Sequence, residues 1–232
     1  ETVTPLTITG DTDKTGTITV FKPDYEIFSD LDVDFDLMTT RYREMAFLNR
    51  GVSITLIDER VDPIVEKVLH YEGGIISFVE YLNRNKTAVH ETPIYFDAEQ
   101  DGCYVEIAIQ YNDSYNENVY TYANNIATIE GGSHLTGFRA ALTKTINDYA
   151  RKYNILKEKD KNLQGEDIRE GICAIVSVKL KNPQFEGQTK TRLGNPEVRT
   201  VVESTVNEKL LIYLEENPQT ARSIGIAHTT ST

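Results

Sequence analysis

EGGSHLTGFRAALTKTINDYARK, residues 130–152, is the stretch of sequence that decides the fold. Two glycines interrupt the chain, and Ser133 follows them with a side chain suited to capping a helix N-terminus. Apolar residues then recur at every third or fourth position, namely Leu135, Phe138, Leu142, Ile146 and Tyr149. This period predicts a glycine turn followed by a long amphipathic helix whose apolar stripe covers a core.

Strand patterns flank this helix in the sequence. Residues 103–111 alternate between apolar and polar side chains, and residues 119–123 are expected to be the partner strand. Residues 172–180 form a third, largely apolar strand, and residues 181–193 a loop. Asn195 and Pro196 then predict a last helix, as cap and first-turn proline. Its inward residues are Val198, Val202, Val206 and Leu210.

The first third of the chain predicts a second α+β unit. The β-branched residues 16–21 indicate a strand. Residues 36–49 indicate a helix, and residues 52–57 and 64–70 a hairpin. The helix is expected to present Met38, Tyr42, Met45 and Leu48 on one face. The paired glycines Gly73 and Gly74 mark the boundary, after which residues 75–83 form a short amphipathic helix.

Composition and charge exclude several classes of function. The 232 residues are 39% hydrophobic and carry 24 basic against 36 acidic side chains, a formal net charge of −12. This balance argues against a protein that coats nucleic acid over its whole surface. Two basic islands depart from it, with net charges of +4 over residues 139–161 and +3 over residues 179–199. No apolar run approaches the roughly 20 residues of a membrane-spanning helix, so no membrane partner is expected.

The sequence also lacks the usual signatures of metal and nucleophile chemistry. The four histidines are far apart, so each is assigned to surface or packing and no metal ligand is predicted. The two cysteines stand in predicted strands and are expected to be buried thiols. Walker, dinucleotide-binding and nucleophile-elbow motifs are absent. The sequence starts with neither a signal peptide nor a Met, and a cytoplasmic fragment of a longer protein is expected.

Several local phrases together resemble one family. They are Lys14-Thr15-Gly16-Thr17, Phe47-Leu48-Asn49-Arg50-Gly51, Tyr71-Glu72-Gly73-Gly74, residues 130–134, Arg169-Glu170-Gly171 and residues 183–194, PQFEGQTKTRLG. In this order they resemble the DNA gyrase B family, the ATP-operated subunits of bacterial type IIA DNA topoisomerases. The resemblance covers about residues 5–222.

The resemblance implies a domain organisation. Residues 1–73 would be the C-terminal part of a GHKL ATPase α/β sandwich, and residues 74–217 a transducer domain of the ribosomal-protein-S5-domain-2-like type. The family's catalytic Glu, its Mg²⁺-binding Asn and its adenine-binding Asp would lie upstream of Glu1. This piece alone is therefore expected not to hydrolyse ATP. Residues 218–232 are expected to be a tail, and Ser223–Thr232 departs from the basic helix of the family.

The resemblance also assigns roles at the nucleotide. Thr17 would help to hold the adenine-side aspartate, with Gly16 allowing close approach, although a plain strand start explains both residues as well. Lys190 would contact the γ-phosphate of ATP from a transducer loop, with Gln188 assisting. A compact ammonium charge suits this task because negative charge builds on a transferring phosphoryl group. The alternative is an ordinary solvated lysine.

The resemblance also implies roles for residues at the DNA and partners in the assembly. Arg139, and more weakly Lys144, would line a cavity through which duplex DNA passes, against the alternative of a solvated helix face. Gly131-Gly132-Ser133 is interpreted as structural rather than as a phosphate site. The implied partners are the gyrase A protein, a second gyrase B chain and double-stranded DNA. A topoisomerase IV subunit, or a non-enzymatic module that kept the transducer fold, stays open as an alternative.

Overall fold

The computed structural model describes the backbone of residues 3–229 and the side chains of residues 3–224. It divides into two compact units, Glu1–Phe35 and Asp36–Thr232, and each is considered by itself. The second unit holds helices α2 (Ile75–Asn83), α3 (Ser133–Lys152), α4 (Gly165–Arg169), α5 (Pro196–Glu216) and α6 (Pro218–Thr229), and nearly all of α1 (Phe35–Leu48). Its strands are β1 (Ser53–Asp58), β2 (Val65–His70), β3 (Ile94–Gln100), β4 (Cys103–Tyr111), β5 (Asn118–Ala123), β6 (Ile126–Ala127) and β7 (Ile172–Leu180). The α+β class is confirmed.

A five-stranded sheet in the order β3-β4-β7-β5-β6 forms the centre of this unit. Strand β5 runs parallel to β7, and the other neighbours are antiparallel. The prediction that residues 119–123 pair with residues 103–111 is wrong, because β7 lies between these strands. Strand β7 is apolar on both faces, and such a strand is stable only where both faces are covered.

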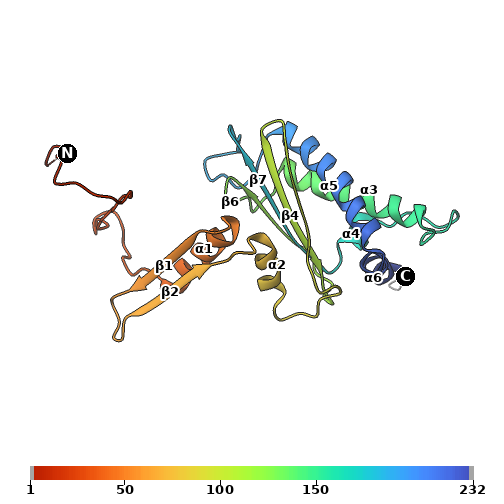
Figure 1. Cartoon of the computed structure of the whole chain (residues 1–232), viewed down its shortest axis with the longest axis horizontal. Helices are drawn as coiled ribbons and strands as arrows, with labels where there is room; N and C mark the ends of the chain where they lie inside the picture. The colour runs from red at the N-terminus through yellow and green to blue at the C-terminus, as the bar shows by residue number, and fades with distance from the viewer. Residues whose placement is uncertain (1–2, 230–232) are drawn as a thin grey trace. The chain divides into compact units, whose positions relative to one another are not determined.

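Helices cover the two faces of the sheet (Figure 1). Helices α3 and α5 pack on one face, where Phe138, Leu142, Val198 and Val202 share a core with inward residues of β4 and β7. Helix α2 covers the opposite face, where Phe78 and Val79 pack on Ala108 and Ile175. The predicted inward face of the last helix is confirmed, since Val198, Val202, Val206 and Leu210 are all buried.

Helix α1 and the β1–β2 hairpin join this unit through aromatic packing. The ring of Phe47 stacks on Tyr71 at 3.8 Å and on Phe78 at 4.7 Å between ring centroids. The hairpin confirms the prediction, with Ser53 opposite His70. The predicted helix face is only partly right, because Met45 is exposed while Ala46 and Phe47 are buried. A boundary at Gly73 stays a prediction, and one core spans it.

The pattern of residues 94–100 did not indicate β3. This strand alternates Ile94 and Phe96, which are buried, with Asp97 and Glu99, which are exposed. It pairs with β4 on one side only and forms an edge of the sheet. Acidic residues are typical of such edges because they oppose pairing with another chain, and they also weaken the sequence signal.

The first unit has no helix or strand among its described residues 3–34. The predicted strand over residues 16–21 is therefore wrong. A strand needs a neighbour for its backbone groups and a covered face for its apolar side chains. Here the side chains of Ile18, Val20 and Phe21 are 80–94% exposed, so they contribute nothing to a core in this structure.

The end of the chain returns to the core. Helix α6 places Ala221 and Ile224 in the cluster beside α3 and α5, so the expected tail begins with a packed helix. Residues 230–232 of the expected tail lie outside the described residues. Among the described residues, no helix has the length and the apolar character needed to cross a membrane.

Candidate functional site

Lys190 lies at the tip of the loop that joins β7 to α5. The Lys190 N–H donates to the carbonyl of Gly187 at 3.3 Å, which closes a tight turn, and both residues have positive φ. Gln188, Thr189 and Lys190 are exposed. The Lys190 ammonium lies 6.0 Å from the centre of the Phe185 ring. The nearby carboxylate of Glu186 pairs with Arg192 instead, so the lysine presents its charge to solvent.

A narrow hairpin supports this turn. The Glu186 N–H donates to the Arg192 carbonyl at 2.9 Å, and the Gly194 N–H donates to the Gln184 carbonyl at 2.7 Å. Asn195 secures the base, because its side-chain oxygen accepts from the Gln184 N–H at 2.6 Å. Asn195 is the N-cap residue of α5 as predicted, but its side chain bonds the loop rather than the helix amides.

The loop that carries Lys190 packs on the start of α3 through backbone hydrogen bonds of Leu193, and this contact is called the seat below. Leu193 donates its N–H to the Gly131 carbonyl and accepts from the Ser133 N–H, both at 3.0 Å. A side chain at position 132 would place its Cβ only 2.2 Å from the Leu193 carbonyl oxygen. Only glycine permits this approach, which supports the structural interpretation of the glycine pair. Ser133 is the first helical residue and not the cap; Gly132 takes that position.

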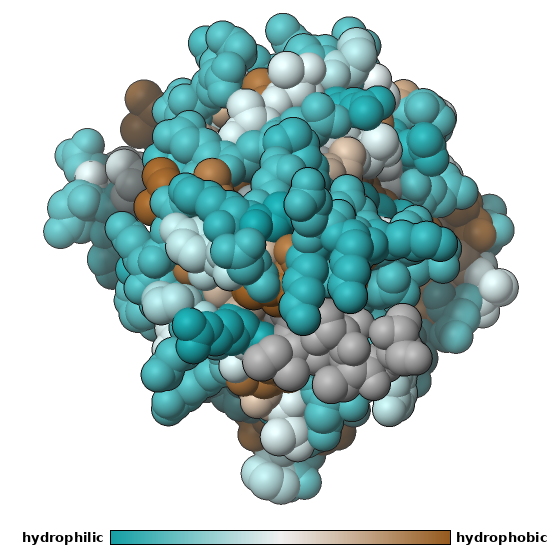
Figure 2. All heavy atoms as spheres, turned by 90° about the vertical axis from the view of Figure 1, so that its right-hand side faces the viewer, coloured by the Kyte–Doolittle hydropathy of each residue, from teal (hydrophilic) through white to brown (hydrophobic). Residues whose placement is uncertain are grey.

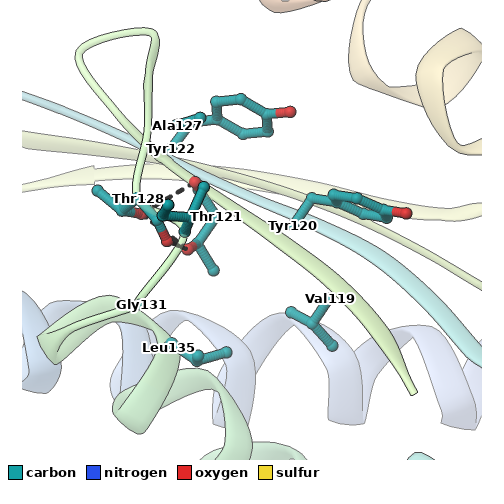
Figure 3. A pocket seen from close by; sticks show the side chains of 9 residues that line it. Val119, Tyr120, Thr121, Tyr122, Ala127, Thr128, Gly131 and Leu135 are labelled. Atoms are coloured by element: carbon teal, nitrogen blue, oxygen red, sulfur yellow. Dashed lines mark hydrogen bonds between the residues drawn. The ribbon is translucent and has the colours of Figure 1, made fainter. Parts of the chain in front are cut away.

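A buried polar group lies behind this seat, beside a pocket of about 280 Å³. The hydroxyls of Thr121 and Thr128 are 2.7 Å apart, and Thr128 Oγ1 lies 2.9 Å from Nε2 of His134. Figure 3 shows the hydrogen bonds between the side chains of the two threonines, which lie on the same side of the strand as Val119 and Leu135. His134 is fully buried, and this burial lowers its pKa to about 4. The histidine is therefore neutral at pH 7 and serves packing, as the sequence indicated.

Gly16 and Thr17 lie in the first unit. Both are exposed, and a Cβ added at Gly16 would meet nothing within 4 Å. The nucleotide roles of Gly16, Thr17, Gln188 and Lys190 stay predictions.

The two cations predicted to line a DNA cavity are both paired with carboxylates. Nε of Arg139 donates to Oε1 of Glu117 at 2.8 Å, and Nζ of Lys144 donates to Asp148 at 2.6 Å. They lie on α3, seven and twelve residues after Gly132. Figure 2 looks onto the molecule from the side of α3, α5 and α6 and shows a mostly hydrophilic face. The roles of Arg139 and Lys144 at the DNA stay predictions.

Sequence reasoning missed Glu117, which also accepts from Nε of Arg169 at 2.9 Å. One carboxylate thus joins two guanidinium groups. Spacing gave no signal for this arrangement, because Glu117 precedes its partners by 22 and 52 residues. Among the described residues, no group of three His, Cys, Asp or Glu side chains is arranged to hold a metal ion.

Comparison with known proteins gives consistent matches. A family model described as DNA gyrase B matches residues 74–228, which takes in most of the expected tail. The DNA gyrase B protein of Clostridium acetobutylicum is 58% identical over 221 residues. That alignment covers 95% of this chain and 34% of the relative, so the chain spans about a third of the relative's length.

Two solved structures are similar over most of the chain. The 43K ATPase domain of Thermus thermophilus gyrase B, in complex with an aminocoumarin, has a TM-score of 0.81 at 38% identity. The alignment covers 91% of this chain and 56% of the Thermus thermophilus chain. The topoisomerase IV ATP-binding domain of Francisella tularensis, in complex with a small-molecule inhibitor, has a TM-score of 0.75 at 27% identity. The alignment covers 90% of this chain and 56% of the Francisella tularensis chain.

Proposed function

The chain belongs to the DNA gyrase B family, and from this premise we propose that it is the transducer-bearing part of an ATP-hydrolysing subunit of a type IIA DNA topoisomerase. In this role it couples ATP binding and hydrolysis to DNA strand passage and negative supercoiling. Its partners are the gyrase A protein, a second gyrase B chain and duplex DNA, in the cytoplasm. The match of residues 74–228 to a family model described as DNA gyrase B, and the 58% identity to a DNA gyrase B protein over 95% of the chain, support gyrase over the alternative.

The observation that carries the proposal is the exposed ammonium of Lys190 on a short hairpin anchored at both ends. A lysine placed in this way meets a phosphate presented by another domain with little rearrangement of its loop. The ammonium stabilises the charge that develops on the transferring phosphoryl group. Gln188 lies in the same turn and assists, while Gly16 and Thr17 serve the adenine side.

The family resemblance implies that the Asn that binds the Mg²⁺ of ATP lies upstream of Glu1, and on this basis we assign no residue of this chain to the metal. The role of the chain at the nucleotide is electrostatic and is limited to the Lys190 turn and the first unit.

The test is the variant Lys190→Ala in a full-length gyrase B protein that contains this chain, assayed with gyrase A and DNA. ATP turnover is expected to fall about 100-fold or more, as for the loss of one preorganised donor. Lys181→Ala is the matched control, because Lys181 is also exposed and lies at the base of the same loop. Unchanged turnover in Lys190→Ala, with the fold intact, would remove Lys190 from the site. A full-length protein without ATP turnover would favour the non-enzymatic module.

The chain itself offers a second test. Calorimetric titration with a non-hydrolysable ATP analogue and Mg²⁺ is expected to show no binding, because the chain would hold only the smaller part of a divided nucleotide site. Micromolar binding would show that a complete pocket lies within these residues and would contradict the proposed division.

A further inference from the structure

We infer that Glu130 is the positioning residue for Lys190, because it ties the loop of Lys190 to the start of helix α3. The inference rests on the proposed function and deepens it. Lys190 is the group that meets the phosphate, and Glu130 acts only through the loop that carries it. The contacts between Glu130 and Thr191 are called the clasp below.

The clasp has two hydrogen bonds between adjacent stretches of chain. The Glu130 N–H donates to the Thr191 carbonyl at 2.9 Å, and the Thr191 hydroxyl donates to the Glu130 carboxylate. Thr191 directly follows Lys190, so the clasp fixes the backbone on one side of the turn. Arg192 adds a long bond from its guanidinium to the Glu130 carbonyl at 3.4 Å.

The turn needs such support. Lys190 has a φ of +56°, a left-handed conformation that is unfavourable for a residue with a Cβ. A strained residue keeps this conformation only where its neighbours hold it. A hydrogen bond from a hydroxyl to an ionised carboxylate is stronger than one between neutral groups, so the side-chain part of the clasp is well suited to this.

The exposure of Glu130 distinguishes a role in positioning Lys190 from a role in the stability of the fold. Glu130 is exposed, and exposed charged contacts contribute little to the free energy of unfolding. Removal of its carboxylate should therefore leave the fold stable while freeing the Lys190 turn. The nearby seat of Leu193 on Gly131 and Ser133 remains, since backbone groups form it.

The first experiment measures steady-state ATP hydrolysis by the full-length protein with gyrase A and DNA. Glu130→Ala and Thr191→Val are each expected to lower kcat about fivefold, with KM for ATP changed by less than about twofold. An interaction that matters in the transition state more than in the bound ground state produces this pattern. Thr191→Ser keeps the hydroxyl and should restore kcat. Glu158→Ala, which removes an exposed glutamate elsewhere, is the control.

The second experiment uses this chain alone and needs no ATP. Trypsin binds its substrate in an extended conformation, so we expect cleavage after Lys190 to require opening of the tight turn that the Lys190 N–H closes. Glu130→Ala is expected to speed cleavage of the Lys190–Thr191 bond several-fold, read by mass spectrometry, without a change in the thermal midpoint. Equal cleavage rates in parent and variant would overturn the inference.

The outcomes distinguish the inference from the function on which it rests. If Lys190→Ala lowers turnover and the two clasp variants do not, the inference about Glu130 fails and the proposed function stands. If Lys190→Ala has no effect, both fail. If Glu130→Ala added to Lys190→Ala causes no further loss of kcat, the two residues act together, as we infer.

Discussion

Arg139 and Arg169 are joined through Glu117, whose two carboxylate oxygens accept from their Nε atoms at 2.8 and 2.9 Å. The side chain of Arg139 is 43% exposed and that of Arg169 only 15%, so Arg139 is the outer member. Any phosphate that reaches Arg139 competes with Glu117 for the guanidinium. The positive charge of Arg139, to which the family resemblance assigns a DNA contact, is therefore partly neutralised by Glu117 within the chain itself.

We expect Glu117→Gln to strengthen the response to DNA. The substitution keeps an amide oxygen for one arginine and removes a negative charge that opposes DNA phosphates. In the full-length enzyme, the DNA concentration for half-maximal stimulation of ATP turnover should fall several-fold at low salt. Glu203→Gln is the matched control, since it frees Arg199 on α5, which has no predicted role at the DNA. Equal effects of the two variants would mean that added positive charge acts without regard to position.

Arg139→Gln should act in the opposite direction. DNA-independent ATP turnover is expected to stay at the parent level, because Arg139 belongs to α3 and not to the Lys190 turn. Stimulation by DNA should weaken, and its dependence on salt should become shallower because one phosphate contact is lost. The same stimulation in variant and parent would leave Arg139 as a solvated surface residue.

Gly132→Ala should destabilise the chain strongly. The new Cβ would lie 2.2 Å from the Leu193 oxygen and 2.6 Å from its nitrogen, so the loop seat must move, and a φ of +134° adds strain. We expect a loss of about 2–4 kcal/mol in the free energy of unfolding by urea titration. Gly102→Ala is the control, because its φ is +74° but nothing lies within 4 Å of the new Cβ. Its smaller loss measures strain alone, and equal losses would show that the Leu193 contact is unimportant.

The regular elements with one clear period were predictable, and the relations between them were not. Helix α3 and strand β7 follow from their apolar patterns, because each buries a continuous stripe or both faces. The edge strand β3 was not predicted, because its outward residues are acidic. The strand expected over residues 16–21 requires a neighbouring strand, and the described residues 3–34 of its unit contain none.

The candidate site shows the same division. The turn around Lys190 and the glycine pair were recognisable as local phrases. Their connection was not, because Glu130 and Thr191 stand 61 residues apart in sequence. Only the arrangement of β7, α3 and α5 brings them together. Pairings of this kind depend on topology, and a local pattern of residues carries no record of them.

The buried His134 makes stability depend on pH. Its pKa is about 4 in the folded chain, because burial disfavours the charged imidazolium, whereas an unfolded histidine has a pKa of about 6.5. The unfolded state therefore binds more protons between these values. The stabilising contribution is complete above pH ~6.5 and is lost as the pH falls towards 4, to a total on the order of 3 kcal/mol.

We expect this to appear when the free energy of unfolding is measured from pH 7 to pH 5, above the range where most carboxylates titrate. The parent should lose stability over this interval, and His134→Gln should lose clearly less, whatever its stability at pH 7. The difference between the two curves cancels the contributions of the other titrating histidines. Among them, His90 has a pKa lowered by burial, and His70 has a pKa raised by its bonds to Val52 and Glu72. Parallel curves would show that His134 takes up its proton in the folded chain as readily as in the unfolded chain, which would contradict its place in the buried threonine network.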